Sequence, residues 1–179
     1  GGTGGGLIRL TVGGLLQVDG ELSADGGAGS GDVVYGRFSG GGSGGSIWID
    51  AAALAGGGSI HAKGGNSGGG KAGGGAGGRI AVHYGTNAFS GTLGAYGGAG
   101  GYERGGAGTI YTQAASETLG DLRVDNGGQS GAVTPLTVPG TFDEVIVANQ
   151  GRLDLSVADV LMADWLTIKG GGIVELQTT

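Results

Sequence analysis

A seven-residue phrase centred on isoleucine occurs four times, and this repeat constrains the fold more than any other feature of the chain. The copies read GGLIRLT, GGSIWID, GGRIAVH and AGTIYTQ, and they centre on Ile8, Ile47, Ile80 and Ile110. A second phrase follows each copy after 12 to 14 residues, centred on Leu22, Ile60, Leu93 and Leu122. A small unit repeated in this way indicates that its copies stack on one another.

Each phrase alternates in the manner of a half-buried strand. Ile47 and Ile49, for example, flank Trp48, and such alternation of β-branched residues is typical of strands with one buried face. Copies of the same strand one repeat apart are expected to pair in parallel and in register, about 4.8 Å apart. We therefore predict an all-β fold, a parallel β-helix (β-solenoid) in which each repeat forms one coil.

Glycine-rich tracts connect the second phrase of each repeat to the first phrase of the next. Fifty of the 179 residues are glycine, concentrated in residues 26–45, 64–78 and 97–108. Each glycine costs about 0.5–1 kcal/mol of chain entropy relative to alanine, so the tracts are either loops or segments whose packing admits no side chain. One candidate is a polyproline-II-like conformation, packed laterally as in collagen on one flank of the solenoid. The alternative is loops that bulge into solvent.

The composition changes after residue 132, where glycine becomes sparse and the only two prolines of the chain occur. Strand phrases nevertheless recur 20 residues apart, Ile146 with Leu166 and Leu153 with Ile173. This spacing predicts further, tighter coils with ordinary side chains.

We accordingly divide the chain into glycine-rich β-solenoid repeats, 1–132, and continuing coils of ordinary composition, 133–179. Within the second part, residues 157–165 (VADVLMADW) are expected to form a short helix or a turn between coils. The chain opens inside a repeat, without an initiator methionine or a signal peptide, so we expect a piece of a longer protein or a mature product.

Charge and composition exclude several classes of function. The net charge is −6, with nine lysines and arginines and no basic run, so no nucleic-acid partner is expected. No apolar run approaches the ~18 residues of a membrane-spanning helix. The chain has no cysteine, which removes disulfides and thiolate metal sites.

Several phrases together carry a resemblance to a known class of protein. GGSGGSIWI, LAGGGSIHAKGG, GGAGGRIAVHY, GGAGTIY and LRVDNGG resemble the glycine-rich repeats of very large secreted and cell-surface proteins of bacteria and some protists. The resemblance covers roughly residues 1–128. It implies a β-helical, adhesin-like or fibre-forming region located outside the cell or on its surface. It includes no catalytic motif, so no site residue follows from it.

Aligning the first phrases predicts two outward columns. One contains Arg9, Trp48, Ala81 and Tyr111, and the next contains Thr11, Asp50, His83 and Gln113. An aromatic platform flanked by hydrogen-bonding groups is typical of carbohydrate sites, so Trp48, Asp50, His83 and Tyr111 form the candidate ligand-binding patch. The alternative is that the aromatic rings cover a neighbouring loop, tract or subunit.

Catalysis is not expected in these columns. A glycoside hydrolase needs two carboxylates about 5–10 Å apart, and the columns offer Asp50 alone. Near matches to a phosphate-binding loop and to a nucleophile elbow lie inside glycine runs, without the helix that both motifs require. We therefore predict no catalytic residue and no enzyme activity.

No metal or cofactor is expected either. The two histidines, His61 and His83, lie one coil apart and are expected to be exposed and solvated. Calcium at the Asp-Gly turns of Asp19, Asp25 and Asp125 remains an open alternative, because aspartate is also simply favoured in turns.

The sequence thus predicts a non-enzymatic structural or adhesive module of an extracellular fibre or surface protein, able to assemble into filaments. Its partners would be other copies of itself or neighbouring repeats of a longer chain. The second hypothesis is a carbohydrate-binding or polysaccharide-processing β-helix with polysaccharide as its partner. An ice-binding protein is a third reading, but it needs a regular threonine ladder and the outward columns are too mixed.

Overall fold

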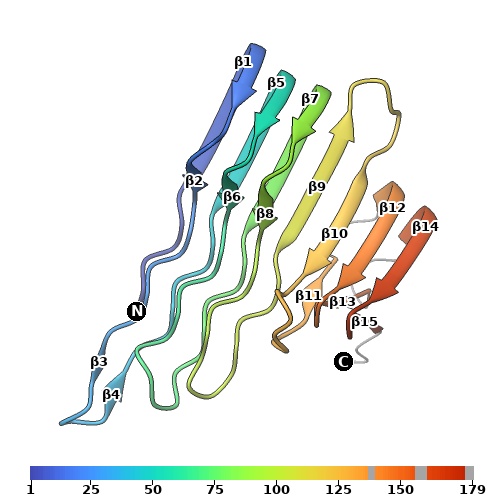
Figure 1. Cartoon of the computed structure of the whole chain (residues 1–179). Coiled ribbons are helices and arrows are strands. Elements are labelled where there is room, and N and C mark those ends of the chain that lie inside the picture. Colours follow the sequence, from blue (N-terminus) through green and yellow to red (C-terminus); the bar gives the residue numbers. More distant parts are fainter. Residues whose placement is uncertain (137–139, 156–160, 176–179) are drawn as a thin grey trace.

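The computed structural model describes residues 1–136, 140–155 and 161–175, and its regular structure consists of strands (Figure 1). The strands are β1 (Leu7–Gln17), β2 (Glu21–Ser23), β3 (Gly31–Asp32), β4 (Arg37–Phe38), β5 (Ser46–Gly56), β6 (Ser59–His61), β7 (Arg79–Phe89), β8 (Thr92–Gly94), β9 (Thr109–Ala114), β10 (Asp121–Asp125), β11 (Thr134–Pro135), β12 (Gly140–Ala148), β13 (Arg152–Asp154), β14 (Leu161–Lys169) and β15 (Ile173–Glu175). No helix in these ranges is long and apolar enough to cross a membrane.

The four isoleucine-centred phrases pair as their alignment predicted. β1, β5, β7 and β9 are parallel neighbours, and Ile8, Ile47, Ile80 and Ile110 are partners in register. Three of these strands are longer than the phrase itself, since β1, β5 and β7 each span 11 residues. The in-register stacking of the first phrases is therefore confirmed.

The first three second phrases form a separate layer. β2, β6 and β8 pair in parallel, with Leu22, Ile60 and Leu93 in register. Their apolar side chains pack against those of the first phrases in one hydrophobic core, which includes Ile49, Ile60 and Val82. Figure 1 shows these three short strands lying over β1, β5 and β7. Two layers that share one core are expected to order each other, because each buries the apolar face of the other.

The prediction of a parallel β-helix is wrong, because the fourth second phrase does not join that layer. β10 lies in the same sheet as β9 and runs antiparallel to it, with Arg123 opposite Ile110 and Leu122 opposite Tyr111. The result is an open, mixed seven-stranded sheet in the order β1-β5-β7-β9-β10-β12-β14. The sheet does not close, and the described residues form no solenoid. Figure 1 shows its two edges, β1 and β14, lying apart.

The hairpin also moves the hydrophobic core to the opposite face of the sheet. Directly opposed residues of an antiparallel pair point to the same face, so Arg123 shares the face of the buried Ile110. Leu122 and Val124 consequently point to the Tyr111 face, where they are buried in a second core with Val145 and Leu153. Each half of the sheet therefore buries a different face.

A third small sheet covers this second core. β11, β13 and β15 pair in parallel, and Leu136, Leu153 and Val174 pack into the same cluster as the buried residues of β10 and β12. The repeat after residue 132 is 21 residues rather than the expected 20, since Val145 pairs with Leu166 and Leu153 with Val174. Residues 161–165 lie in a strand rather than a helix, and the rest of that predicted element, up to residue 160, lies outside the described residues.

The glycine tracts are ordered and form two hydrogen-bonded layers. Outgoing segments (24–30, 62–68 and 95–101) lead away from β2, β6 and β8, and returning segments (1–6, 39–45, 73–78 and 104–108) lead back to β1, β5, β7 and β9. Figure 1 shows both running beyond the sheet, toward the β3–β4 hairpin at the far end. Bulging loops are therefore excluded over most of each tract, and the lateral packing proposed for them is found.

Two of every three backbone N–H groups in these layers donate to a neighbouring segment. The Gly64 N–H donates to the Tyr96 carbonyl of the next outgoing segment at 2.8 Å, and the Gly65 N–H to the Gly42 carbonyl of the other layer at 2.8 Å. The N–H of Asn66, the third residue, has no backbone partner among the described residues. The same order recurs at Gly44, Gly45 and Gly77, Gly78.

The sequence follows this period as X-Gly-Gly triplets. In Lys63-Gly-Gly, Tyr96-Gly-Gly, Ser43-Gly-Gly and Ala76-Gly-Gly, the residue X has an open side and both glycines face another segment. A Cβ on either glycine would overlap a backbone oxygen or nitrogen of the neighbouring segment. Glycine is required here by close approach of backbones, because the neighbouring chain occupies the place of the side chain.

Gly75→Ala is expected to destabilise the protein, and Gly73→Ala is its matched control. A Cβ at Gly75 would overlap the Gly42 carbonyl, whereas the nearest atom to a Cβ at Gly73 is 3.7 Å away. We expect a loss of about 2 kcal/mol or more for Gly75→Ala, since overpacking costs typically 1–3 kcal/mol in a side-chain core and backbone yields less. Gly73→Ala should be neutral or stabilise by up to ~1 kcal/mol. Equal unfolding free energies for both variants in denaturant titrations would contradict the close-packed layers.

Candidate functional site

Four aromatic rings form a stripe across the outward face of the sheet. Trp48 on β5 stacks on His83 of β7 with ring centroids 4.6 Å apart, and His83 meets Tyr111 of β9 at 5.6 Å. Tyr111 in turn contacts Phe142 of β12 edge-on at 6.4 Å. Contacts of this kind contribute about 0.5–1.5 kcal/mol each beyond area burial. Each ring is held in its orientation by contact with the next ring. The last ring, Phe142, packs against the second hydrophobic core.

The register of the sheet brings the predicted site residues together. Asp50 is the direct partner of His83, and Trp48 and Tyr111 are both partners of Ala81. The two outward columns expected from the sequence are therefore confirmed. Trp48 is 41% exposed, so its ring is accessible from solvent.

A shallow hollow of about 520 Å³ lies beside the stripe. Its polar lining comes from one row across the strands, Thr11, Asp50, His83 and Gln113, and from Glu117 in the turn after β9. The buried Nε2 of His83 has no hydrogen-bond partner among the described residues, so the ring keeps one free polar atom. The hollow thus combines an aromatic border with amide, hydroxyl and carboxylate groups.

Glu117 belongs to this hollow and escaped the sequence analysis. It lies in the turn between β9 and β10, where its carboxylate accepts the Ala114 N–H at 3.0 Å. Gln113 reaches the same turn, donating from Nε2 to the carbonyls of Glu117 and Thr118 at 3.3 and 3.2 Å. The repeat alignment assigned this turn to an ordinary coil, so nothing in the pattern placed Glu117 near the columns.

Burial and acidic neighbours raise the pKa of two groups at the Tyr111 end of the stripe. Burial raises the pKa of Tyr111 above 10.0, and the Asp121 carboxylate raises it further, while a hydrogen bond with the Gly120 backbone opposes the shift. Burial also raises the pKa of Asp121, assisted by the charges of Asp143, Glu117 and Glu144 and opposed by the hydrogen bond from the Glu144 N–H. Both shifts thus favour the neutral form of a group that lies among other acidic side chains.

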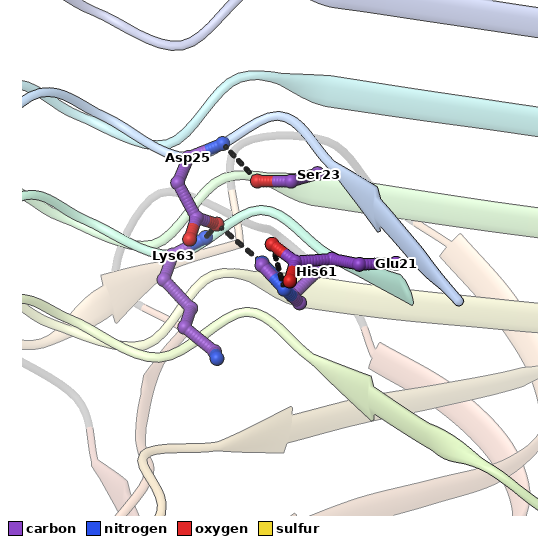
Figure 2. Close-up of polar contacts among 5 residues, drawn as sticks. All are labelled: Glu21, Ser23, Asp25, His61 and Lys63. Atoms are coloured by element: carbon purple, nitrogen blue, oxygen red, sulfur yellow. Dashed lines mark hydrogen bonds and ion pairs between the residues drawn. The ribbon is translucent and has the colours of Figure 1, made fainter. Parts of the chain in front are cut away.

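His61 forms a separate polar cluster on the β2–β6–β8 layer (Figure 2). Its side chain lies between two carboxylates of the preceding repeat, with Nδ1 2.8 Å from Asp25 Oδ1 and Nε2 3.1 Å from Glu21 Oε1. Asp25 also accepts the Lys63 backbone N–H at 2.6 Å. Both contacts are hydrogen bonds at once only when both ring nitrogens carry a proton. The cluster connects adjacent repeats.

The expectation that both histidines are exposed is wrong. His61 is only 7% exposed, between the carboxylates of Glu21 and Asp25. His83 is half-buried in the aromatic stripe. Their different roles follow from the layers in which they lie. His61 belongs to the covering layer, whereas His83 belongs to the outward face of the large sheet.

The three aspartates considered for calcium lie apart and accept protein hydrogen bonds. Asp19 accepts the Gly57 N–H at 3.1 Å, Asp25 binds His61, and Asp125 accepts the Gly127 N–H at 2.8 Å. No group of three or more candidate ligands gathers within residues 1–136, 140–155 and 161–175. Calcium binding at these turns stays a prediction.

No protein-family model, curated protein or solved structure matches this chain. The case for a function therefore comes from its own geometry.

Asp121→Asn is expected to lower the pKa of Tyr111 toward 10.0. The substitution removes the neighbouring charge but leaves the burial, so the pKa stays above its ordinary value. Because the folded state holds this proton to higher pH than the unfolded chain does, the free energy of unfolding should fall as pH rises above about 10. The absorbance of tyrosinate, with Tyr111→Phe subtracted, measures the pKa, and Glu103→Gln at a distant exposed position is the control. An unchanged titration in Asp121→Asn would refute the coupling.

Proposed function

We propose that this chain is a non-enzymatic structural and adhesive module of an extracellular fibre or surface protein. The observation that carries the proposal is the double glycine layer, in which successive segments exchange backbone hydrogen bonds within and between layers. Such an arrangement uses about a quarter of the chain for close backbone packing and leaves little room for variation in side chains. Close backbone packing of this kind fixes the conformation of the chain, which is what a structural module requires.

The pattern of hydrogen bonds supports resistance to load. Strands β1, β5 and β7 are long and parallel, with one shift of register in β1 between Val12 and Leu15, so a force along them acts on many interstrand hydrogen bonds at the same time. The glycine layers extend this bonded network beyond the ends of the strands. Shear across parallel strands is therefore opposed by the whole row of bonds rather than by one bond after another.

The open edges of the sheet suit the partners that we propose, other copies or neighbouring repeats of a longer chain. β1 and β14 each have one side without a strand partner in the described sheet. β14 also exposes Trp165, Leu166 and Ile168, at 70%, 51% and 50%. An edge with free backbone groups and apolar side chains is a template for further strand pairing, including filament formation.

Force spectroscopy and surface labelling test this proposal. With the chain placed between marker domains and pulled from its two ends, we expect a distinct unfolding peak that weakens in Gly75→Ala and persists in Gly73→Ala. Antibodies against the chain should label intact cells of the source organism, and electron microscopy of the purified chain should reveal filaments if copies associate by their edges. Extension without a force peak, or labelling only after cell lysis, would overturn the proposal.

A carbohydrate-binding surface is the second candidate, favoured by the aromatic stripe. Trp48 offers an accessible ring beside Asp50 and His83, and the hollow supplies additional hydrogen-bonding groups. Sugars present apolar faces to aromatic rings and hydroxyls to carboxylates and amides, so the combination suits a polysaccharide lying across the strands.

Trp48→Ala is expected to abolish binding to the neutral glycans of an array, because it removes the platform of this patch. Trp165→Ala, an exposed tryptophan at the far edge of the sheet, is the matched control and should bind as the unaltered chain does. Binding of neutral glycans that survives Trp48→Ala, or the absence of binding to any neutral glycan, would remove this candidate and leave the structural role.

A further inference from the structure

A second hollow, of about 270 Å³, lies on the outgoing glycine layer and is unrelated to the aromatic stripe. Its floor is backbone, at Gly64, Gly97 and Gly98. Lys63, Asn66, Tyr96, Arg104 and Gln129 provide the side chains around it. Lys63 and Tyr96 are both X residues of X-Gly-Gly triplets and lie side by side, since the Gly64 N–H bonds to the Tyr96 carbonyl.

The charge of this hollow is opposite to that of the chain. The protein has 15 acidic and nine basic side chains, yet two cations and no carboxylate line the hollow. In the part of the chain that the structure describes, neither Lys63 nor Arg104 forms an ion pair. Both therefore keep donors available for a ligand.

Two carboxylates beside residues of the hollow are already engaged. Asp25, one segment away from Lys63, accepts hydrogen bonds from the His61 ring and the Lys63 backbone, and Figure 2 shows the Lys63 side chain leading away from it. Burial raises the pKa of Tyr96, and the charge of Asp125 raises it further. Asp125 is itself buried and paired with Arg123 and Asn149. Neither carboxylate neutralises the cations of the hollow.

The wall opposite Lys63 is a fixed turn. Asn126 is 2% exposed, and it accepts the Gly97 N–H at 2.8 Å while donating to the Gln129 carbonyl at 2.7 Å and the Gly105 carbonyl at 3.3 Å. It joins the turn at residues 126–129 to both glycine layers. The Tyr96 ring, which would contact a Cβ at Gly94 or Gly127, is confined between these glycines. The hollow is thus preorganised, which reduces the ordering cost of binding.

We propose that this hollow binds an acidic sugar, a uronate residue of a polysaccharide. The pyranose ring would lie against Tyr96, its carboxylate would accept hydrogen bonds from Lys63 and Arg104, and its hydroxyls would reach Asn66 and Gln129. Charge-assisted hydrogen bonds to a carboxylate are the strongest of these contacts. A glycine floor suits a flat ligand, because no side chain rises between the segments.

Titration calorimetry with an oligogalacturonate tests the proposal, and its methyl ester, which lacks the charge, is the matched ligand. We expect Lys63→Gln and Arg104→Gln each to weaken binding about tenfold, which is about 1.4 kcal/mol, since each removes a charge-assisted hydrogen bond to the carboxylate. Lys63→Arg should retain most of the affinity. Lys71→Gln, at the exposed turn between segments, is the control for net charge. Thermal unfolding checks that each variant is folded.

Trp48→Ala distinguishes binding in this hollow from binding at the aromatic stripe. We expect the variant to bind the oligogalacturonate as the unaltered chain does. Equal affinity for the methyl ester, or unchanged affinity in Lys63→Gln and Arg104→Gln, would overturn the proposal. So would tighter binding of inorganic phosphate or of a single-stranded oligonucleotide at the same residues, which would assign the hollow to phosphate groups instead.

Discussion

The close approach of glycine backbones is the constraint on which the rest of this structure depends. At Gly42, Gly65 and Gly75, the carbonyl of one segment occupies the place where a neighbouring segment would carry a Cβ. This proximity allows hydrogen bonds between layers as well as within them. The returning segments lead directly into β1, β5, β7 and β9, and the outgoing segments leave β2, β6 and β8. The bonded glycine layers are therefore continuous with the two strand layers that enclose the isoleucine core.

The hairpin between β9 and β10 divides the molecule into two parts with different packing. Before it, the chain buries one face of the large sheet beneath β2, β6 and β8, and after it the opposite face beneath β11, β13 and β15. The reversal is local, since the turn is held by Glu117 and Gln113. Its consequence is global, because it leaves the Tyr111 face covered on one side of the hairpin and open on the other. The aromatic stripe lies where these two regions meet.

The two candidate binding surfaces differ in the way they are built. The stripe of Trp48, His83 and Tyr111 consists of side chains on a regular sheet, whose spacing is that of paired strands. The hollow at Lys63 and Tyr96 consists of single side chains on a glycine floor, where two of every three positions have none. An aromatic surface and a cationic hollow on separate parts of one rigid frame are compatible with a surface protein that contacts polysaccharide at more than one point.

The repeat in the sequence was sufficient to predict the strands, their parallel register and the meeting of Asp50 with His83. These features follow from local periodicity, because identical phrases pair identically wherever they become neighbours. The same periodicity predicted a closed coil for the fourth copy and was wrong there. Leu122 follows its first phrase at nearly the same distance in sequence as Leu22, Ile60 and Leu93 do. That distance does not determine the layer in which the strand pairs.

Tertiary structure alone decided which face each strand buries, that His61 lies between Glu21 and Asp25, and that Glu117 reaches the hollow beside the stripe. Each of these depends on how segments far apart in the sequence approach one another. The sequence by itself determined the repeating strands and the need for glycine. The antiparallel pairing of β9 with β10 decided the open mixed sheet. Its register, which places Leu122 opposite Tyr111, decided which face β10 buries, because a shift of one residue would exchange the two faces of the strand.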